Sequence, residues 1–286
     1  MIVLEGRKQS IKGLAFSPES NLLAVAGTAS HVQLWDLKER KVRPILGPKG
    51  PHHVVAFLGP NRLVSLTTSE LRCLRLPTHY DRLDLNRSLG AYFFHGCPTT
   101  EGGFVLVGQT PLTACIVGLN ALGGVRWYRE PDAYLLRVAP LIDGRVVASG
   151  LRKTSFLQLR NGTLGEELSV HFEAVPALAV DPTGKYLAEA AGTHLKLIPL
   201  DNPVQAKKIR NDGRKHFTDV AFHPSGQYLL VSCNDSTVRL YDRDLTEVAA
   251  FDWQLGPIRR VAFSPDGMRA AAGNRVGQVV LWDVDW

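Results

Sequence analysis

The stretch that decides the fold lies near the end of the chain, where Val261-Ala-Phe263-Ser-Pro265-Asp-Gly267 is followed by Met268-Arg-Ala-Ala-Ala272 and then by Val279-Val-Leu-Trp282-Asp283. Two short apolar runs flank the Ser-Pro-Asp-Gly segment, and a third apolar run ends in Trp-Asp. Proline presets one backbone φ and glycine adopts a positive φ at little cost, so the four-residue segment predicts a turn between two strands. The third run predicts a further strand.

Copies of this pattern recur along the chain and define a repeat. The turn-containing copies are Ile11–Pro18, Leu178–Gly184 and Val220–Gly226, and the closing run recurs at Val32–Asp36 and Val238–Asp242. The apolar residue two before the turn proline is predicted at Phe16, Val138, Val180, Phe222 and Phe263, and steps of 42, 42 and 41 residues separate the last four. A weaker copy spans Val54–Pro60, and a third unit is expected near residue 97. Seven units therefore fill the 286 residues.

These units predict an all-β fold, a seven-bladed β-propeller of four-stranded antiparallel blades spanning residues 1–286 as one domain. The apolar runs have strand length and no long run has a helical period, so little helix is expected. Four short strands in about 41 residues match the size of a propeller blade. The last unit ends after its third strand, so Ile2–Leu4 is expected to pair with Val279–Asp283 and close the ring.

The sequence resembles the WD40-repeat β-propellers, because Leu34-Trp35-Asp36 and Leu281-Trp282-Asp283 carry the terminal dipeptide of that family. Ser264–Gly267 resembles its inner turn. The Gly-His of family blades is absent, since Arg7 follows Gly6 and Gln254 stands at the corresponding place in the last unit. The family's turn aspartate survives only as Asp235. The buried hydrogen-bond network of family blades is therefore expected to be missing, and apolar packing must hold the blades together.

Composition limits the function classes further. Apolar residues make up 45% and charged residues 21% of the chain, which is typical of a globular protein, and the net charge of +6 permits acidic partners. No apolar run approaches the roughly 20 residues of a membrane helix, and Met1–Gly6 is unlike a signal peptide, so a cytoplasmic protein is expected. The four cysteines lie far apart, which favours isolated thiols in a reducing compartment.

No catalytic residues, metal ligands or cofactor site can be assigned from the sequence. Gly184-Lys185 lacks the upstream glycine and the following helix of a phosphate-binding loop. His52 and His53 are adjacent and should point to opposite faces of a strand. His95 and Cys97 share a face, but two ligands are too few for a closed zinc site.

A binding surface is the remaining prediction, and the resemblance places it at the start of each inner strand. The residues expected to meet a partner there are Lys12, His53, Tyr134, His216, Thr218 and Arg259. In the third unit the alignment is loose, and Tyr92 or Phe93 is the expected counterpart. Tyr, Arg, Lys and His together are residue types that carry binding energy at interfaces.

Three functions compete on this basis. The leading one is a non-enzymatic scaffold whose rigid end face binds a protein or peptide, an acidic one included, with the protein serving as a monomeric platform within a larger complex and without a membrane partner. The second is nucleic-acid or other polyanion binding through a basic patch at 207–216. That patch comprises Lys207, Lys208, Arg210, Arg214 and Lys215. It lacks the interleaved aromatic residues that single strands need, so nucleic acid is not favoured. The third is an enzyme that uses the central channel.

Overall fold

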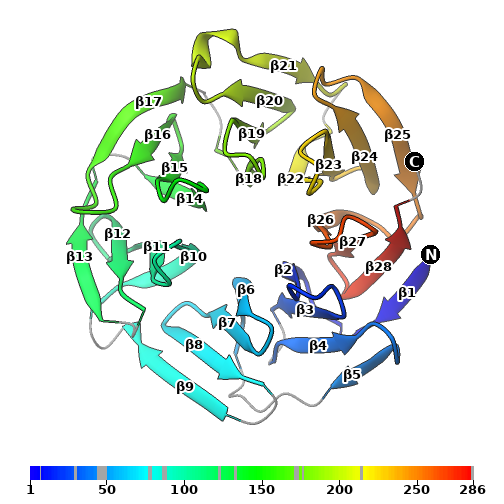
Figure 1. Ribbon diagram of the computed structural model, residues 1–286, viewed down its shortest axis with the longest axis horizontal. Coiled ribbons are helices and arrows are strands. Elements are labelled where there is room, and N and C mark those ends of the chain that lie inside the picture. The colour runs from blue at the N-terminus through cyan, green and yellow to red at the C-terminus, as the bar shows by residue number, and fades with distance from the viewer. Residues whose placement is uncertain are drawn as a thin grey trace.

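The structure, a computed structural model, is a ring of seven β-sheets (Figure 1). It describes residues 1–6, 8–28, 31–43, 50–76, 79–85, 89–121, 124–131, 134–170, 174–175, 177–212 and 215–284. Within these residues every sheet has four antiparallel strands, and the strands of a blade follow one another from the axis to the rim. The seven-bladed, all-β propeller predicted from the repeats is confirmed.

Each blade takes its strands from one stretch of sequence, apart from the last blade. Blade 1 contains β2 (Ile11–Phe16), β3 (Leu22–Gly27), β4 (Gln33–Asp36) and β5 (Lys41–Arg43), and blade 2 contains β6 (Val54–Gly59), β7 (Arg62–Leu66), β8 (Glu70–Arg75) and β9 (His79–Asp84). Blade 3 contains β10 (Tyr92–Pro98), β11 (Phe104–Gln109), β12 (Ala114–Leu119) and β13 (Val125–Arg129). Blade 4 contains β14 (Leu135–Pro140), β15 (Val146–Gly150), β16 (Lys153–Leu157) and β17 (Leu164–Val170). Blades 5 to 7 contain β18 (Ala177–Val180), β19 (Tyr186–Ala191), β20 (His194–Pro199) and β21 (Lys207–Arg210); β22 (Phe217–Phe222), β23 (Tyr228–Cys233), β24 (Thr237–Asp242) and β25 (Glu247–Asp252); and β26 (Ile258–Phe263), β27 (Arg269–Asn274) and β28 (Gln278–Asp283) with β1 (Ile2–Glu5). A 3-10 turn, η1 (Pro203–Gln205), precedes β21.

The first strand completes the last blade, as predicted. β1 pairs antiparallel with β28 in a register that places Ile2 opposite Leu281 and Glu5 opposite Gln278. Both lie at the right of Figure 1, with the N-terminus beside blade 7. Leu4 is 3% exposed and joins the apolar layer between blades 7 and 1. The ring is thus closed by strand pairing, which leaves no open edge between its first and last blades.

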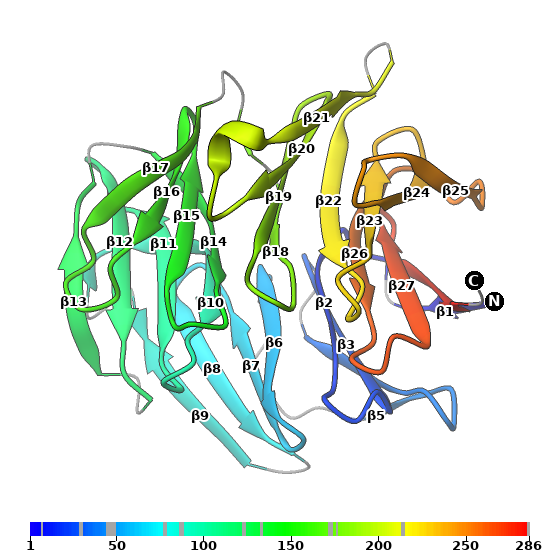
Figure 2. The ribbon, with the colours of Figure 1, turned by 45° about the horizontal axis from the view of Figure 1, so that its top comes forward.

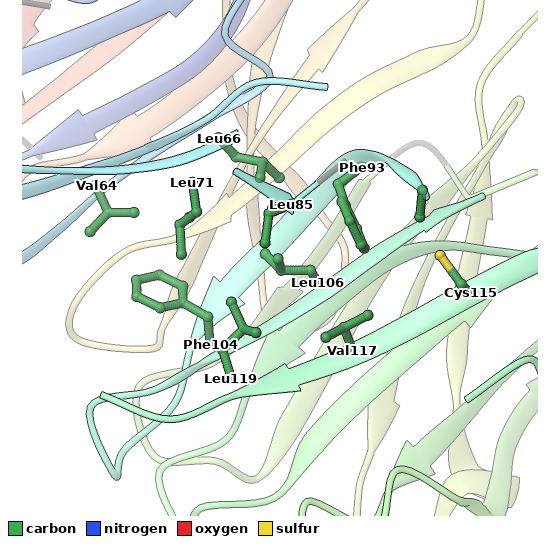
Figure 3. Packing of buried hydrophobic residues seen from close by; sticks show 11 residues of the cluster. Val64, Leu66, Leu71, Leu85, Phe93, Phe104, Leu106, Cys115, Val117 and Leu119 are labelled. Atoms are coloured by element: carbon green, nitrogen blue, oxygen red, sulfur yellow. The ribbon is translucent and has the colours of Figure 1, made fainter. Parts of the chain in front are cut away.

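Apolar side chains fill the layers between neighbouring blades and hold the ring together. Trp35 packs with residues of blades 1 and 7, and Trp282 packs with residues of blades 6 and 7; each is 7% exposed. Tyr241 takes the same place between blades 5 and 6. Figure 3 shows the corresponding layer between blades 2 and 3, where Leu66 faces Phe93. The aromatic residues of these third strands therefore pack between neighbouring blades.

Polar bonding at the Trp282 blade differs from that of family blades, as expected from the missing histidine. The buried Nε1 of Trp282 has no hydrogen-bond partner among the described residues. Asn274 instead organises the turn between β27 and β28, because its Oδ1 accepts from the backbone N–H groups of Val276, Gly277 and Gln278 at 2.9–3.0 Å. Blade 7 therefore combines apolar packing around Trp282 with an asparagine-centred turn.

The register of blade 4 corrects the sequence alignment. Pro140 pairs with Val146 as Phe16 pairs with Leu23, so Pro140 is the last residue of the inner strand and is not the turn proline. The turn follows at Leu141–Gly144, where Gly144 has a φ of +87° and its N–H donates to the carbonyl oxygen of Leu141 at 3.2 Å. The prediction that Val138 is the last apolar residue before the turn is therefore wrong by two residues, because Pro140 holds that place.

Candidate interaction surface at one end of the ring

Two sets of loops meet at one end of the ring, which we call the top end. The loops that lead into the inner strands lie beside the turns between second and third strands, because backbone hydrogen bonds join them. These bonds run from the N–H groups of Thr28, Leu151, Asn234 and Arg275 to the carbonyl oxygens of Ser10, Tyr134, His216 and Pro257 at 2.9–3.2 Å. The turned view in Figure 2 shows inner strands β14, β18, β22 and β26 beside one another around the axis. Rigid strands thus carry the loops of the top end.

A cavity of about 350 Å³ lies at the top end over blades 1, 4, 6 and 7, and we call it the mouth cavity. Its lining comprises Ile11, Lys12, Arg137, His216, Phe217, Thr218, Asn234, Arg259 and Arg260. Four of the six residues predicted to meet a partner are therefore brought together here. They are Lys12, His216, Thr218 and Arg259.

A second cavity of about 150 Å³ lies among the inner strands, and we call it the channel cavity. His53, the fifth predicted residue, lines it together with Lys12. Each blade also contributes one residue at the same place in its inner strand, and these residues recur every 40 to 42 positions. This channel ring consists of Gly13, Val54, His95, Arg137, Ala177, Asp219 and Arg260.

The charged members of the channel ring were not among the predicted site residues. The sequence alignment pointed to the residue just before each of them, as Arg259 precedes Arg260. In blade 4 the two-residue error placed Tyr134 where Leu136 belongs, and so hid Arg137 one position further along. With the alignment of blade 4 corrected by two residues, each ring residue directly follows the position at which a contact residue was expected. The ring could then have been identified from the sequence.

Polar members of the channel ring tie neighbouring blades together. Asp219 Oδ2 accepts from the N–H of Val261 at 2.9 Å, and Arg260 Nε donates to the carbonyl oxygen of Lys12 at 2.6 Å. The N–H of Val138 donates to His95 Nδ1 at 3.3 Å, which requires that nitrogen to be unprotonated. Burial lowers the pKa of His95 well below its usual value, with the positive charge of Arg137 as a further cause, so this imidazole is neutral.

Positive charge dominates both cavities. Lys12, Arg137, Arg259 and Arg260 line them, whereas Asp219 is the one carboxylate among their lining residues. Burial, and then the charges of Arg260 and Arg259, lower the pKa of Lys12. Burial and the neighbouring Arg260 lower the pKa of Arg137 to about 10. The site is therefore an electropositive hollow in which the cations destabilise one another.

Of the other predicted residues, Tyr134 lies outside both cavities, and Thr218 lines the mouth cavity with its hydroxyl already engaged. Tyr134 is 43% exposed and donates its hydroxyl hydrogen bond to Gln109 Oε1, outside the lining of both cavities. Thr218 is 9% exposed, and its Oγ1 donates to the carbonyl oxygen of Ile258 at 2.9 Å, so its hydroxyl is engaged within the fold.

The expected counterpart in the third unit also lies elsewhere. Tyr92 is exposed at the start of β10, and Phe93 is fully buried opposite Gly108. Phe93 therefore corresponds to Ile11, which pairs with Gly27 in the same way. The next residue, Phe94, is then the one in blade 3 that corresponds to Lys12. The register shift after Phe93 explains why the sequence alignment was loose there.

The basic run from 207 to 216 lies mainly on the rim. Lys207, Lys208 and Arg210 are exposed on β21, the outermost strand of blade 5 in Figure 1. Lys207 forms an ion pair with Asp244, and Lys215 forms one with Asp235 at 3.3 Å. The predicted Arg214 lies outside the described residues. Two of the run's charges are therefore compensated by acidic neighbours.

His52 and His53 have different surroundings although they are adjacent in the sequence. His52 is 3% exposed and its Nε2 lies 3.3 Å from Arg72 Nη1, whereas His53 lines the channel cavity. The two rings thus face different surroundings, as predicted, although both residues precede β6 (Val54–Gly59). Over the part of the chain that the structure describes, no three His, Cys, Asp or Glu residues are grouped to hold a metal ion. No helix in that part is both long and apolar enough to cross a membrane.

Comparison with known proteins agrees with the fold. The sequence model of the family described as "WD domain, G-beta repeat" matches residues 1–36 and 209–242. These segments contain the Trp35-Asp36 and Tyr241-Asp242 closings of blades 1 and 6. This match, together with seven repeated units in seven blades, confirms the resemblance of the chain to the WD40-repeat β-propellers.

Relatives among known proteins are WD-repeat proteins of greater length. Human Striatin-4 is 26% identical over 246 residues, covering 84% of this chain and 28% of its own. Target of rapamycin complex subunit wat1 of Schizosaccharomyces pombe is 25% identical over 141 residues, covering 49% of this chain and 45% of its own. Pre-mRNA-processing factor 19 homolog 2 of Arabidopsis thaliana is 31% identical over 128 residues, covering 43% and 24%. The chain thus spans less than half the length of these relatives.

Proposed function

We propose that this protein is a non-enzymatic scaffold that binds a protein or peptide at the top end of its propeller. The observation that carries the proposal is the convergence of Lys12, His216 and Arg259 on the mouth cavity. They come from blades 1, 6 and 7, and Lys12 and Arg259 lie more than 200 residues apart in the sequence. The closed ring of blades nevertheless holds them at one opening. Loops on a rigid support are where recognition residues concentrate.

The partner in this proposal presents acidic groups to the mouth cavity. Lys12 and Arg259 are half-buried there, and Arg259 offers a planar fork that matches a carboxylate with two hydrogen bonds. Tyr134 and His53 extend the proposed contact toward blades 4 and 2. We place the protein in the cytoplasm, as a monomeric subunit of a larger complex. The name of the relative wat1, a target of rapamycin complex subunit, supports membership of a larger complex.

The rim offers less support for nucleic acid as the partner. Phosphate binding relies on several uncompensated cations along one surface, and two lysines of the basic run are paired with Asp244 and Asp235. A salt titration separates the alternatives, since binding to a nucleic-acid backbone weakens steeply as salt rises.

The test begins with affinity capture and mass spectrometry to identify the partner, followed by affinity measurements with variants. Replacing Lys12, Tyr134 and Arg259 together by alanine should weaken binding by about thirtyfold or more, because truncation of interface hot spots typically costs about 2 kcal/mol or more. The control replaces Lys208 and Arg210, which are exposed on the rim strand β21, and should bind as the parent does.

Both variants must first show the parent's unfolding curve. Full affinity in the Lys12/Tyr134/Arg259 variant would remove the binding site from the top end. Loss of affinity only in the control would move the site to the rim.

A further inference from the structure

We propose that the mouth of the channel is a binding site for a phosphoryl group carrying two or more negative charges. This inference rests on the proposed function, because it concerns the same mouth cavity and names the chemical group that a ligand would present there. It rests on how charge, burial and hydrogen bonding are arranged around the mouth and channel cavities.

The cations around the mouth come from different blades and converge on one space. Lys12 of β2, Arg137 of β14 and Arg260 of β26 line both cavities, and Arg259 lines the mouth cavity alone. Blades 1, 4 and 7 therefore supply positive charge to a hollow of about 350 Å³ that opens at the top end. An anion in this position would be approached from more than one side.

Acidic compensation at this place comes from Asp219, whose charge acts on Arg260 and Arg137. Asp219 is the one carboxylate in the lining of the two cavities, and its Oδ2 already accepts from the N–H of Val261 at 2.9 Å. Neither Lys12, Arg259 nor Arg260 forms an ion pair with any carboxylate of the described residues. A bound anion would place its negative charge among cations that repel one another.

Hydrogen bonding leaves the charged groups available for a ligand. Arg260 donates Nε to the carbonyl oxygen of Lys12 and Nη1 to that of Arg259, at 2.6 and 2.8 Å. These bonds fix the guanidinium between two strands and leave Nη2 without a partner among the described residues. Lys12 Nζ and the guanidinium of Arg259 donate to no described residue either. A preorganised arginine with two further cations is suited to phosphoryl oxygens, which accept several charge-assisted hydrogen bonds at once.

A phosphoryl group fits this arrangement better than a single carboxylate. Four lining cations exceed the one lining carboxylate by three charges, so a dianion compensates more of the repulsion than a monoanion. Such a group can belong to a free phosphate compound or to a phosphorylated side chain, and the chemistry of recognition is the same for both.

The experiment measures binding by isothermal titration calorimetry with four probes. Inorganic pyrophosphate represents the free source, and a glycine-flanked phosphoserine peptide represents the chain-borne source. The unphosphorylated peptide and acetate are the comparators. Binding of pyrophosphate or phosphopeptide, at least about tenfold tighter than acetate, is the expected result, because each additional charge-assisted hydrogen bond is worth about tenfold or more.

Variants assign the binding to the mouth. The double change Lys12→Gln with Arg259→Gln should weaken binding of the phosphoryl probe by about tenfold or more. The double change Lys208→Gln with Arg210→Gln alters net charge equally, on the exposed strand β21, and should change affinity less than about twofold. Lys12→Arg keeps the charge and should retain binding.

Each outcome decides the proposal. Equal weakening in the two double variants would show that binding follows net charge and would overturn the site. Failure of the parent to bind either phosphoryl probe more tightly than acetate would overturn it as well. If phosphoryl binding is absent while the protein partner still depends on Lys12 and Arg259, the scaffold function survives and this inference does not.

Discussion

Replacing Leu4 by alanine tests the closure of the ring by its first strand. Leu4 is 3% exposed and lies opposite Val279, in the apolar layer that contains Trp35 and Ile11. The change removes three buried carbon atoms, worth about 0.8 kcal/mol each by transfer, and leaves a cavity whose cost adds to that sum. We expect the free energy of unfolding to fall by about 3 kcal/mol.

Chemical unfolding in urea, followed by tryptophan fluorescence, measures this loss. With a slope of about 3 kcal/mol per molar urea, the midpoint should fall by roughly 1 M. Val3→Ala is the matched control, because Val3 is on the same strand but 38% exposed, and it should shift the midpoint far less. Equal midpoints for the two variants would refute the closure of blade 7 by a packed first strand.

Two further predictions concern packing and pH. Gly118→Ala places a Cβ in steric overlap with the Trp127 ring and should destabilise the protein by about 1–3 kcal/mol in thermal unfolding. The control Gly165→Ala meets nothing closer than 3.6 Å and should be nearly neutral. Equal melting temperatures for the two variants would contradict the packing of Trp127. Burial, and then the charge of Arg72, lower the pKa of His52 to about 4 in the folded state, so the unfolded state binds more protons between about pH 4 and 6.5. Stability should therefore fall by up to about 3 kcal/mol as the pH drops through that window, and a His52→Gln variant should lack this part of the loss in pH-dependent urea unfolding.

Much of the fold could be predicted from local sequence, because each blade repeats the same turn chemistry. Gly184, Gly226 and Gly267 all have a φ near +70°, and each closes the predicted turn between first and second strands. The role of Ile2–Leu4 followed from the missing fourth strand of the last unit. These features depend on neighbours in the chain, which sequence displays directly.

The candidate site could be predicted only in part, because it depends on register in blades whose turn signals are weak. Pro140 imitates the turn proline of other units although it ends an inner strand, and this displaced the alignment from Arg137. Asp219 and Arg260 looked like ordinary polar residues of a strand. Their shared position at the axis could be read from the sequence only once the register of blade 4 is known.

The most direct test of the central claim is hydrogen–deuterium exchange of the protein with and without its captured partner. Slower exchange in the complex is predicted at the top end, within residues 8–12, 50–54, 215–218 and 257–260. The turns at the opposite end, including 181–184, 223–226 and 264–267, should exchange as in the free protein. Protection confined to those turns or to the rim strand β21 would contradict a scaffold that binds at the mouth of its channel.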